Sequence, residues 1–163
     1  MTAMSIETAR AHLARFGRDG DVVETSGSSA TVALAAAELG VEPARIAKTL
    51  AFYGADDGTS ILVVAAGDAR VDNAAFKAAF GLKARMLKAE DVERLTGHAP
   101  GGVCPFANPA VATVHLDASL RRFGTVFPAV GNAASAIELT PEEIETISGA
   151  AGWVAVTKGP PTD

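Results

Sequence analysis

The chain of 163 residues contains one cysteine, one tryptophan and one tyrosine, and only 6% of its residues are aromatic. A single cysteine excludes an internal disulfide and a cysteine-cluster metal site. The three histidines, His12, His98 and His115, lack the paired spacing that metal ligands commonly have. The sequence therefore offers no recognisable metal-ligand pattern, and we expect no cofactor.

Basic residues are fewer than acidic ones. The chain has 14 Lys and Arg against 19 Asp and Glu, and its formal net charge is −5. The chain thus has no global positive field to attract nucleic acid, although a small local contact stays open. The first residues do not resemble a secretory signal, and the apolar runs are too short to span a membrane. We therefore expect a cytoplasmic location, with no membrane and no DNA as partner.

Hydrophobic residues make up 48% of the chain and charged residues 20%. These proportions suit one globular domain over residues 1–163 with a substantial core, and they argue against disorder. We expect an N-terminal helix over 5–18 and a frayed tail over 158–163.

Helix and strand signals interleave along the chain without the regular alternation of a doubly wound fold. The further predicted helices cover 32–39, 72–81, 89–96 and a segment that begins at Thr140, and the predicted strands cover 22–25, 46–53, 61–66, 84–87, 111–116, 125–127, 136–139 and 153–156. A turn at 56–58 makes a hairpin of 46–53 and 61–66, and the apolar run 61–66 is typical of a central strand. The fold class is α/β in the α+β-like sense: a mixed, partly antiparallel sheet surrounded by helices.

One loop, residues 96–106, concentrates three glycines, two prolines, His98 and the single cysteine. Glycines let backbone amides approach a ligand closely, and prolines stiffen the chain. The loop therefore suits a ligand held through the main chain. His98 is either a loop-packing residue or a hydrogen-bonding group in a pocket. Cys104 is either a nucleophile or, as we favour, a small packed residue, because a reactive thiol needs a stabilised thiolate.

Two other segments carry candidate groups. Lys48 is the only charge in the strand-like stretch 46–52. It is either an outward-facing lysine on a half-buried strand or a fixed cation for a phosphate, carboxylate or polarised carbonyl. Gly131 and Asn132 form either a simple turn or a second source of backbone donors.

Five motifs occur together in order, and as a set they resemble the YbaK family, whose fold is shared with the editing domain of bacterial prolyl-tRNA synthetases. The resemblance extends from about Val22 to Val156. The motifs are Ala30-Thr31-Val32, Ile46-Ala47-Lys48-Thr49-Leu50, Gly67-Asp68, Thr96-Gly97-His98 and Gly101-Gly102-Val103-Cys104-Pro105-Phe106.

The resemblance implies a free-standing aminoacyl-tRNA deacylase that removes a small wrong amino acid, most often from proline tRNA, without a metal. Its partners would be the acceptor end of tRNA and, optionally, a synthetase. The catalytic positions would be Lys48, Gly101 and Gly102, with the two glycine amides holding the developing oxyanion and the ribose 2'-hydroxyl positioning water. The substrate-binding positions would be Thr31, Thr49, His98, Val103, Cys104, Pro105, Phe106, Gly131 and Asn132.

Within that set, we expect His98, Cys104 and Phe106 to line the pocket that selects the amino acid by size. Some relatives have serine where this chain has Cys104, serine near Ala129 and a basic residue near Asn132. Two alternative functions remain open, namely a Cys104-dependent hydrolase and a non-catalytic binding module of the same fold.

Overall fold

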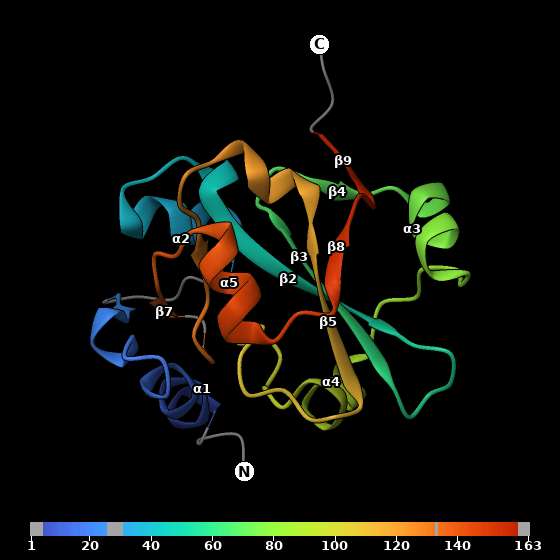
Figure 1. The fold of residues 1–163 in the computed structure, drawn as a ribbon, viewed down its shortest axis with the longest axis horizontal. Coiled ribbons are helices and arrows are strands. Elements are labelled where there is room, and N and C mark those ends of the chain that lie inside the picture. The colour runs from blue at the N-terminus through green and yellow to red at the C-terminus, as the bar shows by residue number, and fades with distance from the viewer. Residues whose placement is uncertain (1–4, 26–30, 133, 160–163) are drawn as a thin grey trace.

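An antiparallel hairpin forms the centre of the sheet, as the sequence predicts (Figure 1). The computed structural model describes residues 5–25, 31–132 and 134–159. Strand β2 (Ile46–Tyr53) pairs with β3 (Ser60–Ala66), from Ala47 opposite Ala66 to Tyr53 opposite Ser60. Every residue of β3 is buried, because β3 has a neighbouring strand on each side and other elements cover both of its faces.

The main sheet has the order β6-β2-β3-β5-β8, in which only the β2–β3 pair is antiparallel. Its other strands are β5 (Ala112–Asp117), β6 (Phe127–Pro128) and β8 (Gly152–Val154). Two small antiparallel ladders join β1 (Val23–Glu24) to β7 (Ser135–Ala136) and β4 (Arg70–Val71) to β9 (Thr157–Lys158). The predicted mixed, partly antiparallel sheet is thus confirmed.

Local sequence signals mark the starts of α2 and α5. Thr31 accepts a hydrogen bond from the Leu34 amide at 3.1 Å, and Thr140 and Glu143 form a capping box. The helices surround the sheet, with η4, β4 and β9 at one end of the molecule and α1 and α4 at the other (Figure 1). They are α1 (Ser5–Ala14), η2 (Asp19–Asp21), α2 (Val32–Leu39), η3 (Pro43–Arg45), α3 (Asn73–Phe80), α4 (Ala89–Thr96), η4 (Ala118–Arg122) and α5 (Pro141–Ser148).

Three sequence expectations are corrected. Helix α1 ends at Ala14 instead of Arg18, because the chain leaves the helix toward Gly17, which has a φ of +72°. The predicted strand 84–87 is reduced to a single bridge between Phe52 and Met86. Lys158 belongs to β9 instead of a frayed tail, and residues 160–163 lie outside the described part.

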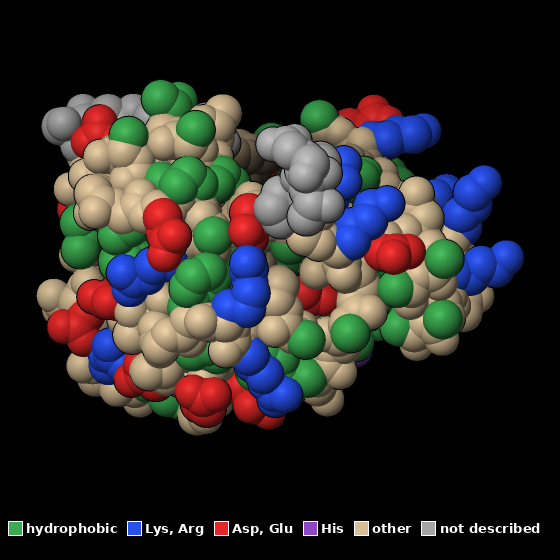
Figure 2. All heavy atoms as spheres, turned by 90° about the horizontal axis from the view of Figure 1, so that it is seen from above, with side chains coloured by type: hydrophobic (Ala, Val, Ile, Leu, Met, Phe, Trp, Pro, Cys, Tyr) green, Lys and Arg blue, Asp and Glu red, His purple; other side chains and the backbone are tan. Residues whose placement is uncertain are grey.

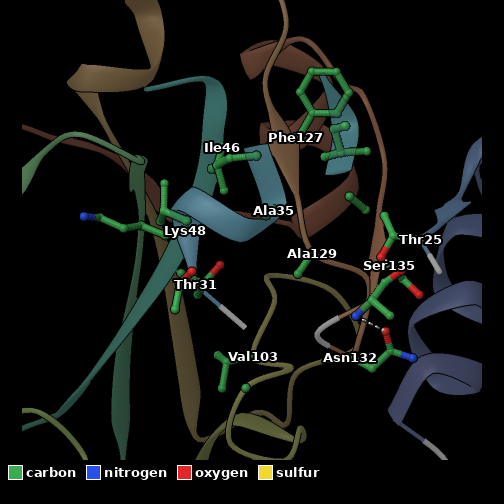
Figure 3. A pocket seen from close by; sticks show the side chains of 17 residues that line it. Thr25, Thr31, Ala35, Ile46, Lys48, Val103, Phe127, Ala129, Asn132 and Ser135 are labelled. Atoms are coloured by element: carbon green, nitrogen blue, oxygen red, sulfur yellow. Dashed lines mark hydrogen bonds between the residues drawn. The ribbon is translucent and has the colours of Figure 1, made fainter. Parts of the chain in front are cut away.

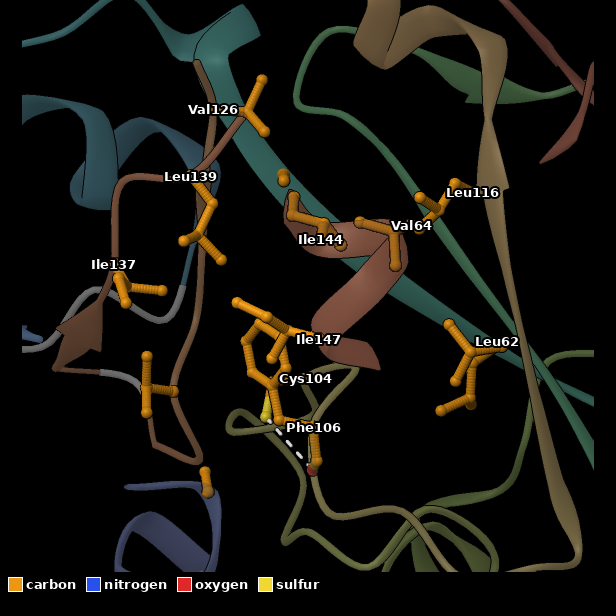
Figure 4. Close-up of a cluster of buried hydrophobic side chains, with 14 of the residues drawn as sticks. Leu62, Val64, Cys104, Phe106, Leu116, Val126, Ile137, Leu139, Ile144 and Ile147 are labelled. Atoms are coloured by element: carbon orange, nitrogen blue, oxygen red, sulfur yellow. Dashed lines mark hydrogen bonds between the residues drawn. The ribbon is translucent and has the colours of Figure 1, made fainter. Parts of the chain in front are cut away.

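The main core lies between the sheet and two helices at the ends of the chain. Ala9 and Leu13 of α1 and Ile144 and Ile147 of α5 pack with Leu62 and Val64 of β3 and with other buried residues. Figure 4 shows that Cys104 and Phe106 of the glycine loop belong to this core. The loop is therefore fixed from behind by the core.

Candidate functional site

A cavity of about 240 Å³ lies at the open edge of β2 (Figure 3). Strand β6 pairs with β2 only at Ile46 and Ala47. Beyond these residues β6 no longer pairs with β2, and Lys48 and Thr49 line the cavity. Helix α2, the segment 127–136 and loop residues Gly101 and Val103 complete the walls. The cavity thus forms where strand pairing stops.

The cavity brings together six of the residues that the sequence singled out, from four separate segments. Figure 3 shows Lys48 and Thr31 on one side, Asn132 on the other and Val103 at a third wall. The remaining walls are mainly apolar and come from Val32, Ala35, Leu39, Ile46, Phe127 and Ala136. A small apolar pocket with a few polar groups at its margin is typical of a binding site.

The amine of Lys48 is held by backbone carbonyls, and whether it also binds a ligand stays a prediction. Its Nζ donates to the carbonyls of Gly67 at 3.3 Å and Ala69 at 2.5 Å, so the amine points to the 67–69 turn, away from Ala129 (Figure 3). Burial lowers the pKa of Lys48, and the charge of Asp68 opposes that shift. Since an ammonium has three donors, one remains for a ligand.

Asp68 does not neutralise Lys48 through an ion pair, because it is engaged elsewhere. Its carboxylate accepts hydrogen bonds from both terminal nitrogens of Arg122, one of them at 3.1 Å. The hydrogen bond from Arg122 is the main cause of the lowered pKa of Asp68. The turn that holds Lys48 is therefore anchored to η4 by a bidentate pair.

The two loop glycines have different roles. Gly102 donates its amide to the Ala99 carbonyl at 2.9 Å, so the prediction that this amide holds an oxyanion is corrected. A Cβ at Gly102 would lie 2.5 Å from the Gly131 carbonyl oxygen and 2.9 Å from the Asn132 Cα. Gly101 has a φ of +89°, and its amide has no hydrogen-bond partner among the described residues. Gly101 alone of the two keeps an available donor at the cavity.

The glycine at position 102 therefore allows two loops to touch. Asn132 stabilises the partner turn, since its Oδ1 accepts from the Ala134 amide at 2.9 Å. Gly131 and Pro105 are both buried, and neither lines the cavity. These two residues position the walls from behind.

His98, Cys104 and Phe106 do not line the cavity, and this expectation is corrected. All three side chains are fully buried in the described structure. His98 Nε2 lies 2.7 Å from the Phe106 carbonyl oxygen and 3.4 Å from Cys104 Sγ. Burial raises the pKa of Cys104 to about 12 and lowers that of His98. Both neutral groups brace the loop from its core side.

The Cys104 environment argues against a thiol nucleophile and gives a direct prediction. A thiol with a pKa of about 12 is almost entirely protonated at pH 8. We expect iodoacetamide at pH 8 to leave the folded protein unlabelled and to label it fully in urea, as measured by mass spectrometry. If the deacylase activity that the motifs imply is present, Cys104→Ala should keep its rate within about threefold of wild type. Loss of all turnover in that variant would restore the thiol mechanism.

Sequence reasoning missed two contributions to the site. Asn108 donates from Nδ2 to the carbonyls of Thr96 at 2.7 Å and Cys104 at 3.0 Å, which joins the two ends of the loop. The Asn108-Pro109 pair signals a turn, but nothing in the sequence indicates these long-range bonds. Ser135, on β7, lines the cavity, and no sequence pattern marked it.

Two cavity hydroxyls lack partners. Thr49 Oγ1 and Ser135 Oγ are buried, and neither has a hydrogen-bond partner among the described residues. Ser135 as a whole is 5% exposed. Thr49 and Ser135 line the cavity, but both hydroxyl oxygens are buried in the wall, where an unpaired polar atom is uncommon.

Within the described residues, no group of three or more His, Cys, Asp or Glu side chains is placed to hold a metal ion. In the same part of the chain, no helix is long and apolar enough to cross a membrane.

Comparison with known proteins identifies the family. The aminoacyl-tRNA editing domain matches residues 27–147. A Bacillus subtilis protein, "Uncharacterized protein YwhH", is 50% identical over 95% of this chain and 98% of its own length. An Enterococcus faecalis protein, "Putative Cys-tRNA(Pro)/Cys-tRNA(Cys) deacylase EbsC", is 30% identical over 69% of each chain.

A solved structure agrees with this match. The crystal structure of "a putative trans-editing enzyme for prolyl tRNA synthetase" superposes with a TM-score of 0.84 at 29% identity, over 95% of this chain and 98% of that one. The resemblance that the ordered motifs indicated is thereby confirmed, in fold and in sequence. The chain belongs to the aminoacyl-tRNA editing domain family.

Proposed function

We propose that this protein hydrolyses the ester bond of mischarged aminoacyl-tRNA in trans, with a small wrong amino acid on proline tRNA as the substrate. The observation that supports the proposal is the cavity, whose lining includes Lys48, with its amine held at the adjoining 67–69 turn, and Gly101, whose amide has no partner among the described residues. The relative named as a deacylase and the trans-editing structure support the same class of reaction.

In the proposed reaction, water attacks the ester carbonyl carbon, and the bond to the ribose oxygen then breaks with transfer of a proton to that oxygen. The Gly101 amide stabilises the oxyanion, and the remaining donor of Lys48 binds the terminal phosphate or the carbonyl oxygen. One such donor contributes about 3–4 kcal/mol to the transition state. The 2'-hydroxyl of the substrate positions the water. An activated ester needs no protein nucleophile, which suits a site whose thiol is buried.

Selection by size follows from the dimensions of the cavity. A volume of about 240 Å³, lined by Val32, Ala35 and Ile46, accommodates a short side chain. One methylene changes binding by only about 1–3 kcal/mol, so size alone separates close homologues weakly.

The unpaired hydroxyls of Thr49 and Ser135 add a chemical criterion. If either side chain rotates toward the cavity, a substrate with a hydroxyl or thiol would satisfy it, whereas an apolar substrate would leave it unpaired. We expect Ser135→Ala and Thr49→Val to lower kcat/KM for seryl esters about tenfold and to leave alanyl esters nearly unchanged. Rates on matched seryl and alanyl tRNA measure this ratio. An equal fall in kcat/KM for both esters would contradict recognition of the seryl side chain. The two hydroxyls would then contact a group that seryl and alanyl esters have in common.

The proposed function is tested by a deacylation panel of alanyl, seryl, cysteinyl, threonyl and 2-aminobutyryl esters on proline tRNA and on their cognate tRNAs. We expect hydrolysis of at least one small ester on proline tRNA. Intact esters throughout would favour a non-catalytic binding module. Undiminished hydrolysis of a 2'-deoxy substrate would exclude the role of the 2'-hydroxyl.

A further inference from the structure

Two exposed cations face each other beside the site. The β4–β9 ladder places Arg70 directly opposite Lys158. Side chains opposite each other on antiparallel strands have Cβ atoms about 5 Å apart, and like charges there are destabilising. A ladder of only two residue pairs thus contains a repulsive pair.

The backbone that carries this pair is held in place. The buried carboxylate of Asp117 accepts from the Val156 amide at 2.9 Å and from Thr157 Oγ1 at 2.6 Å, and the Asp72 amide donates to the Val156 carbonyl at 2.8 Å. The strand that carries Lys158 is therefore anchored.

Nearby carboxylates do not neutralise the pair. Asp117 is engaged with β9, and Asp68 with Arg122. Neither Arg70 nor Lys158 forms an ion pair within the described residues. An anchored, uncompensated cation pair is a surface suited to an external anion.

The cation pair continues the edge of the cavity. Arg70 directly follows Ala69, whose carbonyl oxygen accepts the hydrogen bond from Lys48. Figure 2 looks onto the end of the molecule that carries β4 and β9 and shows Lys and Arg side chains interspersed with Asp and Glu side chains. We call Arg70 and Lys158 the cation strip.

We propose that the cation strip binds the sugar–phosphate backbone of the RNA acceptor stem while the ester lies in the cavity. This inference rests on the proposed function. A chain with a net charge of −5 needs a local basic surface to bind a polyanion, and the strip provides one next to Lys48.

The test compares charge reversals at two places. Arg70→Glu/Lys158→Glu changes the strip, and Lys83→Glu/Lys88→Glu makes the same charge change at exposed residues on the connection between α3 and α4. Dissociation constants for uncharged proline tRNA are measured at several salt concentrations, and hydrolysis is measured on a short aminoacyl-adenosine ester. Arg70→Gln/Lys158→Gln serves as a milder variant, and thermal unfolding verifies that each variant is folded.

We expect the strip reversal to weaken tRNA binding at least tenfold. The slope of log Kd against log salt should fall by about 1 for each phosphate that the variant no longer binds. Hydrolysis of the short ester should stay at the wild-type rate, and the control reversal should change Kd less than threefold. An equal weakening by both reversals, or an unchanged Kd in the strip variants, would overturn the inference.

The two proposals fail separately. Wild-type protein that hydrolyses neither tRNA esters nor the short ester contradicts the proposed function, while the binding measurement alone still decides whether the strip holds RNA. Normal hydrolysis with an unchanged salt slope contradicts only the strip.

Discussion

Replacing Lys48 with alanine should lower kcat/KM for deacylation by about 100-fold or more, with the fold retained. The amine is held by the Gly67 and Ala69 carbonyls beside the cavity, and in the proposed reaction its third donor binds the substrate. A preorganised donor of this kind typically contributes a factor of about 10²–10³ to the rate. Lys48 is half-buried on β2, so its loss removes a charge without opening the main core. Single-turnover rates on a mischarged tRNA measure the effect.

Lys48→Met separates charge from packing, because methionine keeps an unbranched apolar side chain without the charge. We expect Lys48→Met to be as inactive as Lys48→Ala but closer to wild type in stability. Lys88→Ala is the matched control, since it removes an exposed lysine at the start of α4, and its rate should equal that of wild type. Full activity in Lys48→Met would show that the amine takes no part in the reaction.

Gly102→Ala should destabilise the protein by about 1–3 kcal/mol and lower kcat/KM by about 10- to 100-fold. The new Cβ would lie 2.5 Å from the Gly131 carbonyl oxygen and 2.9 Å from the Asn132 Cα, both of them backbone atoms. The two loops must then separate, and Gly101 and Asn132 move with them out of the cavity wall. Urea unfolding and single-turnover kinetics measure the two effects.

Gly124→Ala is the matched control for this substitution. A Cβ at Gly124 meets no atom within 4 Å, and its φ lies outside the left-handed region. We expect its free energy of unfolding to stay within about 0.5 kcal/mol of wild type and its activity to be unchanged. If Gly102→Ala behaves like this control, the close approach of the two loops is not required for the site.

Local signals in the sequence were sufficient for most of the fold. The hairpin of 46–53 and 60–66, the Thr31 cap and the capping box at Thr140 depend on neighbouring residues and on apolar periodicity. Errors occurred where a few residues decide an element, as in the single bridge at Met86 and the short strand at Lys158. Such short pairings depend on partners distant in the sequence.

For the candidate site, the sequence alone determined which segments matter, because glycine, proline and a lone lysine stand out in an apolar chain. The ordered motifs also determined the family, which the comparisons confirm. Only the tertiary structure decided the direction of each group. In the folded protein His98 and Cys104 are buried, and the Gly102 amide donates to the Ala99 carbonyl. Ser135 lines the cavity. The physical reason is that burial and hydrogen bonding are set by contacts between distant segments, which residue type and spacing do not specify.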